Sequence, residues 1–219
     1  LALHEELEQA LAKLLGAESA LVFGTGYMAN LGIIPALVGP GDVVVSDALS
    51  HASIIDGIRL APAQRNTYKH GNMKHLEQKL EMHQDKRMRI IITDGVFSMD
   101  CDIAPLDELY EVAEEHGVMT MVDDAHGLGV LGPSGRGTLE HFGLDQTQVP
   151  ILMGTLGKAL GTVGAFVAGS DELIETLIQF ARTYIYTTAS PPAIAEATRT
   201  SLRVIDDEPW RRETLGELV

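Results

Sequence analysis

The apolar residues of this chain follow two spacings in turn, one typical of helices and one typical of buried strands. Leu3, Leu7, Leu11 and Leu14 recur every three or four residues before Gly16, which predicts a helix at the start of the chain. Short runs rich in apolar residues predict strands at 19–23, 42–46, 65–68, 88–93, 118–122, 150–155 and 163–168. Helical spacing predicts further helices over 27–38, 51–60, 73–84, 106–116, 171–182 and 192–206.

This alternation of strands and helices indicates an α/β fold. Strands that are apolar on both sides are typical of a mainly parallel sheet with helices on both faces. The strand at 163–168 follows 150–155 too closely for a crossover helix, so we expect it to pair antiparallel. The ends of the parallel strands should then gather polar residues at one edge, where ligands bind in such sheets.

Composition narrows the classes of partner. With 16 basic and 31 acidic residues the net charge is −15, which disfavours binding to a nucleic-acid phosphate backbone. No apolar run approaches the roughly 18 residues that a membrane span requires. A single cysteine, Cys101, excludes an internal disulfide framework and a cysteine zinc site, and it favours the cytoplasm. We therefore expect small-molecule partners and no metal, nucleic acid or membrane.

The strand at 118–122 leads directly into two aspartates and a histidine, Asp123, Asp124 and His126. A carboxylate delivered to a buried strand end needs a cationic partner, because an unpaired buried charge is very costly. The protonated nitrogen of a pyridine ring would be such a partner. The alternative is that one aspartate caps a turn and His126 is an ordinary loop histidine.

Lys158 follows the next strand within the glycine-rich stretch 154–161. The flanking glycines leave room for a planar aldehyde on its amine, and desolvation would lower its pKa and free the nucleophile. Thr155 is suitably placed to offer a hydroxyl to a phosphate. The alternative is a solvated lysine in a glycine turn. The glycine spacing does not fit a phosphate-binding P-loop.

A third glycine motif lies between the first strand and the second helix. Glycines at a helix amino terminus let backbone amides converge on a phosphate. Gly24, Gly26 and Ala29 also satisfy the dinucleotide fingerprint, with Asp42 or Asp47 roughly 20 residues further on. A nicotinamide-dependent dehydrogenase is therefore one alternative, and a non-catalytic α/β interaction domain is another.

Two more polar groups follow strand ends. His51 begins a predicted helix and is placed to lie flat on an aromatic cofactor ring, with Ser50 as a candidate helix cap. Ser98 lies in a polar loop after the strand at 88–93 and offers a hydroxyl donor. Their plain alternatives are a hydrogen-bonded histidine and a solvated loop.

Five clusters, each at the carboxyl end of a strand and in this order, resemble the α-oxoamine synthases within the type I fold of pyridoxal-phosphate enzymes. The resemblance runs from His4 to about Ile205. It implies the large domain of that fold, pyridoxal 5′-phosphate as cofactor, and Lys158 as the residue that holds it and moves protons at the substrate α-carbon. It also implies that Asp123 pairs with the pyridine nitrogen.

The remaining site roles are implied by the same resemblance. His126 and Ser98 would hydrogen-bond near the phenolic oxygen of the ring, and His51 would stack on its face. Gly26 and Tyr27 would bind cofactor at their helix terminus, with Thr155 on the phosphate. Thr187 and Thr188 would reach the phosphate of the neighbouring subunit, which implies a homodimer with shared active sites.

The reaction implied by the family is the decarboxylative condensation of an amino acid with an acyl thioester on CoA or a carrier. The stretch 179–188 and the Ser-Pro-Pro-Ala that follows at 190–193 favour the family member that joins L-alanine and a pimeloyl thioester in biotin synthesis. The stretch 154–161 is equally similar to a member that uses glycine and acetyl-CoA.

Two residues depart from the usual pattern of the family, and the chain divides into two parts. The family usually has glutamate where Asp94 stands and glycine where Cys101 stands, and glycine reaches backbone angles that cysteine does not favour. The chain begins at Leu1 without an initiator methionine, and family members are longer. We expect a cofactor-binding large domain over 1–206 and, over 207–219, the start of a connection to a small C-terminal domain that carries the arginine for the substrate carboxylate.

Overall fold

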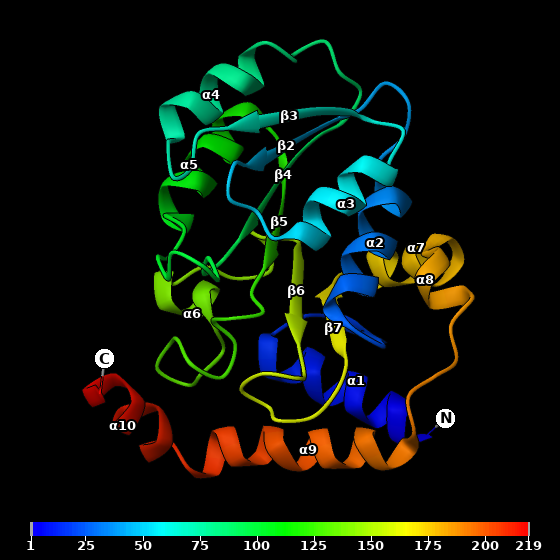
Figure 1. Ribbon diagram of the computed structural model, residues 1–219, viewed down its shortest axis with the longest axis vertical. Helices are drawn as coiled ribbons and strands as arrows, with labels where there is room; N and C mark the ends of the chain where they lie inside the picture. The colour runs from blue at the N-terminus through cyan, green and yellow to red at the C-terminus, as the bar shows by residue number, and fades with distance from the viewer. Residues whose placement is uncertain (1, 219) are drawn as a thin grey trace.

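Seven strands form one twisted sheet through the centre of the computed structural model, which describes residues 2–218 (Figure 1). Their order across the sheet is β1-β7-β6-β5-β4-β2-β3. The strands are β1 Ser19–Phe23, β2 Val43–Asp47, β3 Gln64–Tyr68, β4 Arg89–Asp94, β5 Met119–Asp123, β6 Ile151–Thr155 and β7 Ala165–Gly169. All seven lie within about two residues of the ranges predicted from the apolar runs.

The direction of the strands agrees with the sequence prediction. Strands β3, β2, β4, β5 and β6 run parallel to one another. Strand β7 is antiparallel both to β6, with Leu152 opposite Ala168, and to β1, with Leu21 opposite Val167. The short link between β6 and β7 therefore allows a hairpin-like return, as expected for a connection without a crossover helix.

Helices cover both faces of the sheet because successive strand residues point to opposite sides. In β4, Ile90 and Ile92 join a core with the helices α2, α3 and α7, whereas Ile91 joins a core with α4 and α5 on the other face. A third core lies beneath α1 and α9, which run side by side at the lower edge of Figure 1. The same alternation determines which of the two carboxylates at the end of β5, Asp123 or Asp124, faces the candidate site.

The helices are α1 Ala2–Leu15, α2 Gly26–Leu37, α3 Ala52–Leu60, α4 Met73–Glu81, α5 Leu106–His116, α6 Thr138–Phe142, α7 Asp171–Phe180, α8 Arg182–Ile185, α9 Pro192–Asp207 and α10 Trp210–Leu218. The longer helices match the prediction, while α6, α8 and α10 were not predicted. One local expectation was wrong. The cap of α3 is His51, whose ring accepts from the Ser53 amide, and not Ser50, whose hydroxyl is buried without a partner among the described residues.

Within residues 2–218, no helix has the length and apolar character needed to cross a membrane.

Candidate functional site

The carboxyl ends of β4, β5 and β6 bring the predicted catalytic residues together. Asp94 ends β4, Asp123 ends β5, and Lys158 lies in the loop after β6. The Nζ atom of Lys158 is 2.6 Å from Nε2 of His126, which lies in the loop after β5. Asp123 and Asp94 act electrostatically on the pKa of Lys158, and His51 acts on the pKa of Asp123. Four motifs that are far apart in the sequence therefore meet at one place.

Asp123 is a buried carboxylate without a cationic partner. Only 4% of the residue is exposed, and no Lys, Arg or His among residues 2–218 lies within ion-pairing distance of it. Its Oδ2 accepts from the Asn30 side chain at 2.8 Å, and its Oδ1 accepts from the Ala125 amide at 3.1 Å. Burial raises its pKa, while the Asn30 hydrogen bond opposes that rise. A cation placed beside this carboxylate would relieve the cost of its burial.

Asn30 connects Asp123 to His51 through a chain of side-chain contacts. Its amide nitrogen donates both to Asp123 and to Oγ of Ser53, the latter at 2.9 Å. The Ser53 hydroxyl lies 2.7 Å from Nδ1 of His51. Asn30 is fully buried in α2, and its own Oδ1 has no partner among the described residues. This chain fixes the imidazole and the carboxylate relative to each other.

Asp94 shares the electrostatic field of the site. Burial, and next the charge of Asp123, raise its pKa to about 7. Its Oδ2 accepts from the His51 backbone amide at 2.9 Å, which ties the end of β4 to the start of α3. Two carboxylates close enough to influence each other make the site strongly receptive to positive charge.

The Lys158 amine and the His126 ring are both shifted toward their neutral forms. Partial burial lowers the pKa of Lys158, while Asp123 and Asp94 oppose that change. Burial, and then the charge of Lys158, lower the pKa of His126. A neutral imidazole is able to accept a hydrogen bond from the lysine amine, and a lysine that loses its proton more readily is a better nucleophile.

Asp124 follows Asp123 directly but points to the other face. Its Oδ2 accepts from the Thr138 amide at 2.8 Å, and three glycines, Gly95, Gly127 and Gly137, lie so close that a Cβ on any of them would overlap it. Asp124 therefore organises the glycine loop. This role is similar to the alternative given for one of the two aspartates, which was that it caps a turn.

The amino end of α2 presents backbone amides that have no hydrogen-bond partner within the described part of the chain. Thr25 caps this helix by accepting from the Met28 amide, which leaves the Gly26 and Tyr27 amides without an intrahelical acceptor. The Tyr27 hydroxyl donates to Asp56 at 2.8 Å. Thr155 donates to the Gly164 carbonyl at 3.1 Å.

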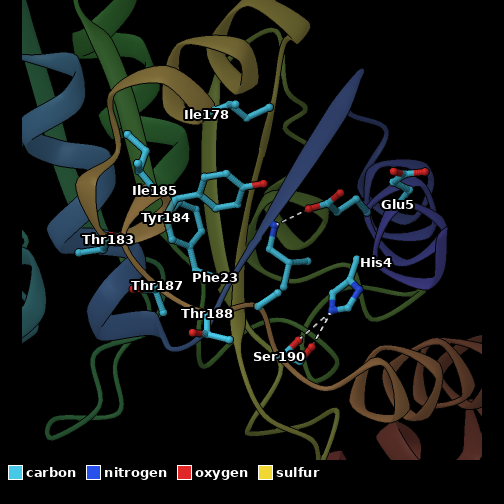
Figure 2. Close-up of a pocket in the computed structure, with 14 residues that line it drawn as sticks. His4, Glu5, Phe23, Ile178, Thr183, Tyr184, Ile185, Thr187, Thr188 and Ser190 are labelled. Carbon is cyan, nitrogen blue, oxygen red and sulfur yellow. Dashed lines mark hydrogen bonds between the residues drawn. The ribbon is translucent and has the colours of Figure 1, made fainter. Parts of the chain in front are cut away.

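The remaining predicted residues are not brought to Lys158. Ser98 is exposed in the loop after β4 and makes no side-chain hydrogen bond to the described residues. Thr187 and Thr188 are exposed and line a hollow of about 470 Å³ beside Gly24 and His4 (Figure 2). The His4 ring holds this segment by bonding the Ser190 carbonyl at 2.8 Å.

The structure removes the dehydrogenase alternative. The dinucleotide fingerprint needs a first strand that is followed by an adjacent parallel strand, but β1 lies at the sheet edge and pairs only with antiparallel β7. Both acidic candidates are also engaged elsewhere. Asp42 forms a two-point ion pair with Arg87, and Asp47 accepts from His70 and from two backbone amides.

Sequence reasoning missed Asn30 and Ser53. An asparagine in a helix whose neighbours are almost all apolar was the available signal, because a buried amide needs partners. Its partners lie on α3 and β5, and only the packing of those elements identifies them.

Comparisons with known proteins identify the family of this chain. A family model described as aminotransferase class I and II matches residues 1–219. The 8-amino-7-oxononanoate synthase of Hahella chejuensis is 58% identical over 216 residues, which is 99% of this chain and 54% of that protein. The enzyme of the same name from Methylococcus capsulatus is 59% identical over 214 residues, 98% of this chain and 55% of its own length. The chain thus spans about half the length of the curated relatives that it matches.

Solved structures show the same architecture. Serine palmitoyltransferase from S. paucimobilis with a bound PLP–myriocin aldimine matches with a TM-score of 0.95 and 40% identity, over 99% of this chain and 54% of that one. The 8-amino-7-oxononanoate synthase of Francisella tularensis matches with a TM-score of 0.85 and 38% identity, over 97% and 61%. The predicted resemblance to α-oxoamine synthases and the predicted type I fold are confirmed. By its matched family model, its relatives and its fold, the chain belongs to the aminotransferase class I and II family.

Proposed function

We propose that the protein to which this chain belongs is a pyridoxal-phosphate-dependent α-oxoamine synthase that condenses L-alanine with a pimeloyl thioester to give 8-amino-7-oxononanoate in biotin synthesis. The observation that carries the proposal is the buried Asp123 carboxylate without a cation, next to a lysine whose pKa is lowered. The names of the relatives supply the reaction and its substrates.

The residues at the site fit the chemistry of this cofactor. Asp123 would hold the proton of the pyridine nitrogen, which supplies the positive charge that the buried carboxylate lacks. The unpaired amides of Gly26 and Tyr27 at a helix terminus suit a phosphate, and the Thr155 hydroxyl would turn from the Gly164 carbonyl to join them. When bound, pyridoxal phosphate supplies an electron sink that stabilises negative charge at the α-carbon of an amino acid.

The side chains of this chain have distinct tasks in the proposal. Lys158 would hold the cofactor through Nζ and later remove the proton from the substrate α-carbon. His126, 2.6 Å from that amine, would orient it and bond near the phenolic oxygen of the cofactor. His51 would lie on the ring face, fixed by Ser53 and by its backbone bond to Asp94. Ser98 would complete the donors at the phenolic oxygen.

A homodimer with shared active sites is part of the proposal. Thr187 and Thr188 are exposed on a segment that is held by His4, and they line the hollow beside it (Figure 2). They would therefore serve the phosphate site of a neighbouring subunit. Residues 1–206 would form the cofactor domain, and residues 207–219 the start of the connection to a small domain with the arginine for the substrate carboxylate. The cytoplasm is the setting that we propose.

The decisive test is the visible spectrum of the full-length protein. We expect a yellow band that borohydride bleaches, leaving a pyridoxyl group on the peptide that contains Lys158. A Lys158→Ala variant should lack both, while Lys74→Ala on the exposed face of α4 should keep both. A full-length protein that stays colourless with added pyridoxal phosphate would overturn the proposal.

The substrate is tested separately. L-Alanine with pimeloyl thioester should release carbon dioxide and the free thiol, and glycine with acetyl-CoA should react more slowly by a wide margin. Faster turnover of the second pair would keep the cofactor assignment and overturn the substrate assignment.

A further inference from the structure

A histidine outside the cofactor site bridges two aspartates. Nδ1 of His70 is 2.9 Å from Oδ1 of Asp47, and Nε2 of the same ring is 2.7 Å from Oδ2 of Asp102. Asp47 ends β2, whereas Asp102 lies in the loop that joins β4 to α5. One imidazole therefore connects two segments 55 residues apart in the sequence (102 − 47).

The geometry requires the protonated ring. A carboxylate only accepts hydrogen bonds, so each ring nitrogen must carry a hydrogen to satisfy both partners. A neutral imidazole has one N–H, and its other nitrogen would turn a lone pair toward a carboxylate. In agreement with this geometry, the hydrogen bonds to Asp47 and Asp102 raise the pKa of His70 despite its burial.

The two aspartates differ in how firmly they are held. The Asp47 side chain is 1% exposed and also accepts from the backbone amides of Leu49 and Gly71. The Asp102 side chain is 47% exposed, and His70 is its hydrogen-bond partner. Asp47 is therefore firmly held, and Asp102 is the partner that would separate from the His70 ring.

The His70 ring also contacts Phe97, which lies at the other end of the exposed loop tip from Asp102. His70 packs edge-on against the Phe97 ring, with centroids 4.4 Å apart. Phe97 and Asp102 are paired through a backbone hydrogen bond of 3.0 Å, and Ser98 lies between them on the exposed tip. His70 therefore contacts both Phe97 and Asp102, which are the residues at the two ends of the tip that carries Ser98.

We propose that His70, as an imidazolium, is a positioning residue that clamps the loop 95–104 against the end of β2, and that the clamp opens when the ring loses its proton. The clamp holds the loop that carries Ser98 at the carboxyl edge of the sheet, where the loop follows the end of β4 at Asp94. Only the consequence for the cofactor rests on the proposed function.

The other ionisable groups around the ring do not replace it. Among residues 2–218, Asp47 and Asp102 are the charged groups that hydrogen-bond to the His70 ring. Tyr68 lies beside Asp47 on β3, but burial raises the pKa of its phenol far above the ordinary value, so it stays neutral. Asp94 on β4 is coupled to Asp47, whose charge contributes to raising the Asp94 pKa.

Hydrogen exchange of the full-length protein, measured by mass spectrometry on peptides covering 95–104, tests the clamp without cofactor. An Asp102→Asn variant removes the charge and should speed corrected exchange of this loop by about fivefold at pH 6, as expected for a partly exposed charged pair. Asp100→Asn, an exposed aspartate in the same loop, is the matched control and should exchange like the wild type. His70→Gln, which keeps one neutral donor, should behave like Asp102→Asn.

The pH dependence separates a clamp from a general packing role. A group with a raised folded pKa stabilises the fold below its unfolded pKa and loses that effect as pH rises through the folded value. Wild-type loop exchange, corrected for intrinsic rate, should therefore increase as pH rises above about 6.5, the ordinary histidine value. Asp102→Asn should lack this step, while α5 stays protected in every variant. Exchange in Asp102→Asn that equals wild type at all pH values would overturn the clamp.

Cofactor binding is measured on the same variants. Loop release should weaken pyridoxal-phosphate affinity about threefold if Ser98 reaches the phenolic oxygen, an effect within the range of one ordinary hydrogen bond. Loop release with unchanged affinity in a yellow protein upholds the clamp and overturns the role of Ser98. A colourless protein with a releasable loop upholds the clamp and overturns the proposed function.

Discussion

Two neighbouring aspartates at the end of β5 have opposite surroundings. Asp123 continues the face of Met121 and meets α2, while Asp124 continues the face of Val122 and meets α6. Both are buried, and burial raises the pKa of both. They differ in what surrounds the carboxylate, because Asp123 has a side-chain amide on one side and the site on the other, whereas Asp124 is enclosed by glycines.

The difference shows that an aspartate can serve ligand binding at one position and the folding of a loop at the next. The glycines around Asp124 let the backbone approach until the loop itself surrounds the carboxylate, although its Oδ1 has no hydrogen-bond partner among the described residues. Asp123 is held by the distant helix α2 and by the Ala125 amide, and it has no ion-pair partner among the described residues. Alternation along a strand sends the two to opposite faces, and the packing on each face decides the role.

The largest expected effect distinguishes the two carboxylates by cofactor affinity. Breaking a buried charge pair costs about 3–5 kcal/mol, so Asp123→Asn should weaken pyridoxal-phosphate binding by at least about a hundredfold. Asp124→Asn should leave affinity within about threefold of wild type. Absorbance titration of the full-length apoprotein measures both, and an equal loss in the two variants would contradict the division of roles.

A second effect concerns stability and pH. Burial raises the pKa of Asp124 to about 7 from 3.8, so the folded chain binds the extra proton between these values and loses stability as pH rises from about 4 to 7. Asp124→Asn removes this loss and should gain up to roughly 4 kcal/mol at pH 8 relative to pH 4, an upper bound from the size of the shift. Urea unfolding at the two pH values measures the gain. An unchanged difference between them would show that Asp124 ionises normally.

A third effect tests the packing of the glycine loop. Gly137 has φ = 92°, and a Cβ there would overlap Oδ2 of Asp124. Gly137→Ala should therefore lower the free energy of unfolding by about 3 kcal/mol, from backbone strain and overpacking together. Gly143→Ala, at φ = 70° with nothing within 4 Å, carries the strain alone and should cost about 1 kcal/mol. Equal losses would remove the steric part of the argument.

A fourth effect tests how Asp123 is held. Asn30→Leu removes the hydrogen bond that opposes the rise of the Asp123 pKa, so this pKa should rise further. Cofactor affinity should fall about tenfold near neutral pH, typical of a lost hydrogen bond to a charged group, and should recover as pH increases. Ser53→Ala leaves the bond to Asp123 intact and should lack this pH-dependent recovery. A loss in Asn30→Leu that is the same at all pH values would indicate a packing effect only.

Most of the sheet could be predicted because buried strands are continuous apolar runs, and their ends then located the polar motifs. Lys158 and Asp123 were predicted as neighbours, and the electrostatic coupling between them agrees. The helices α6 and α8 span too few turns to show a period, and α10 buries none of its residues, so it has no apolar face to detect. Asn30 and His70 depend on contacts between distant elements, and their partners at Asp123 and Asp102 follow only from the three-dimensional packing.

The smallest effect lies away from both carboxylates of β5, at the tip of the loop that His70 clamps. Cys101 is the non-glycine residue with positive φ, 61°, within residues 2–218, at a position where related sequences were expected to have glycine. Relief of left-handed strain is worth about 1–2 kcal/mol, and the extra freedom of glycine in the unfolded chain offsets about 0.5–1 of it. Cys101→Gly should therefore stabilise the protein by about 0.5–1 kcal/mol in urea unfolding. Cys101→Ala keeps a Cβ and should change stability little, so an equal gain in both variants would place the benefit in loss of the thiol rather than in relief of the backbone.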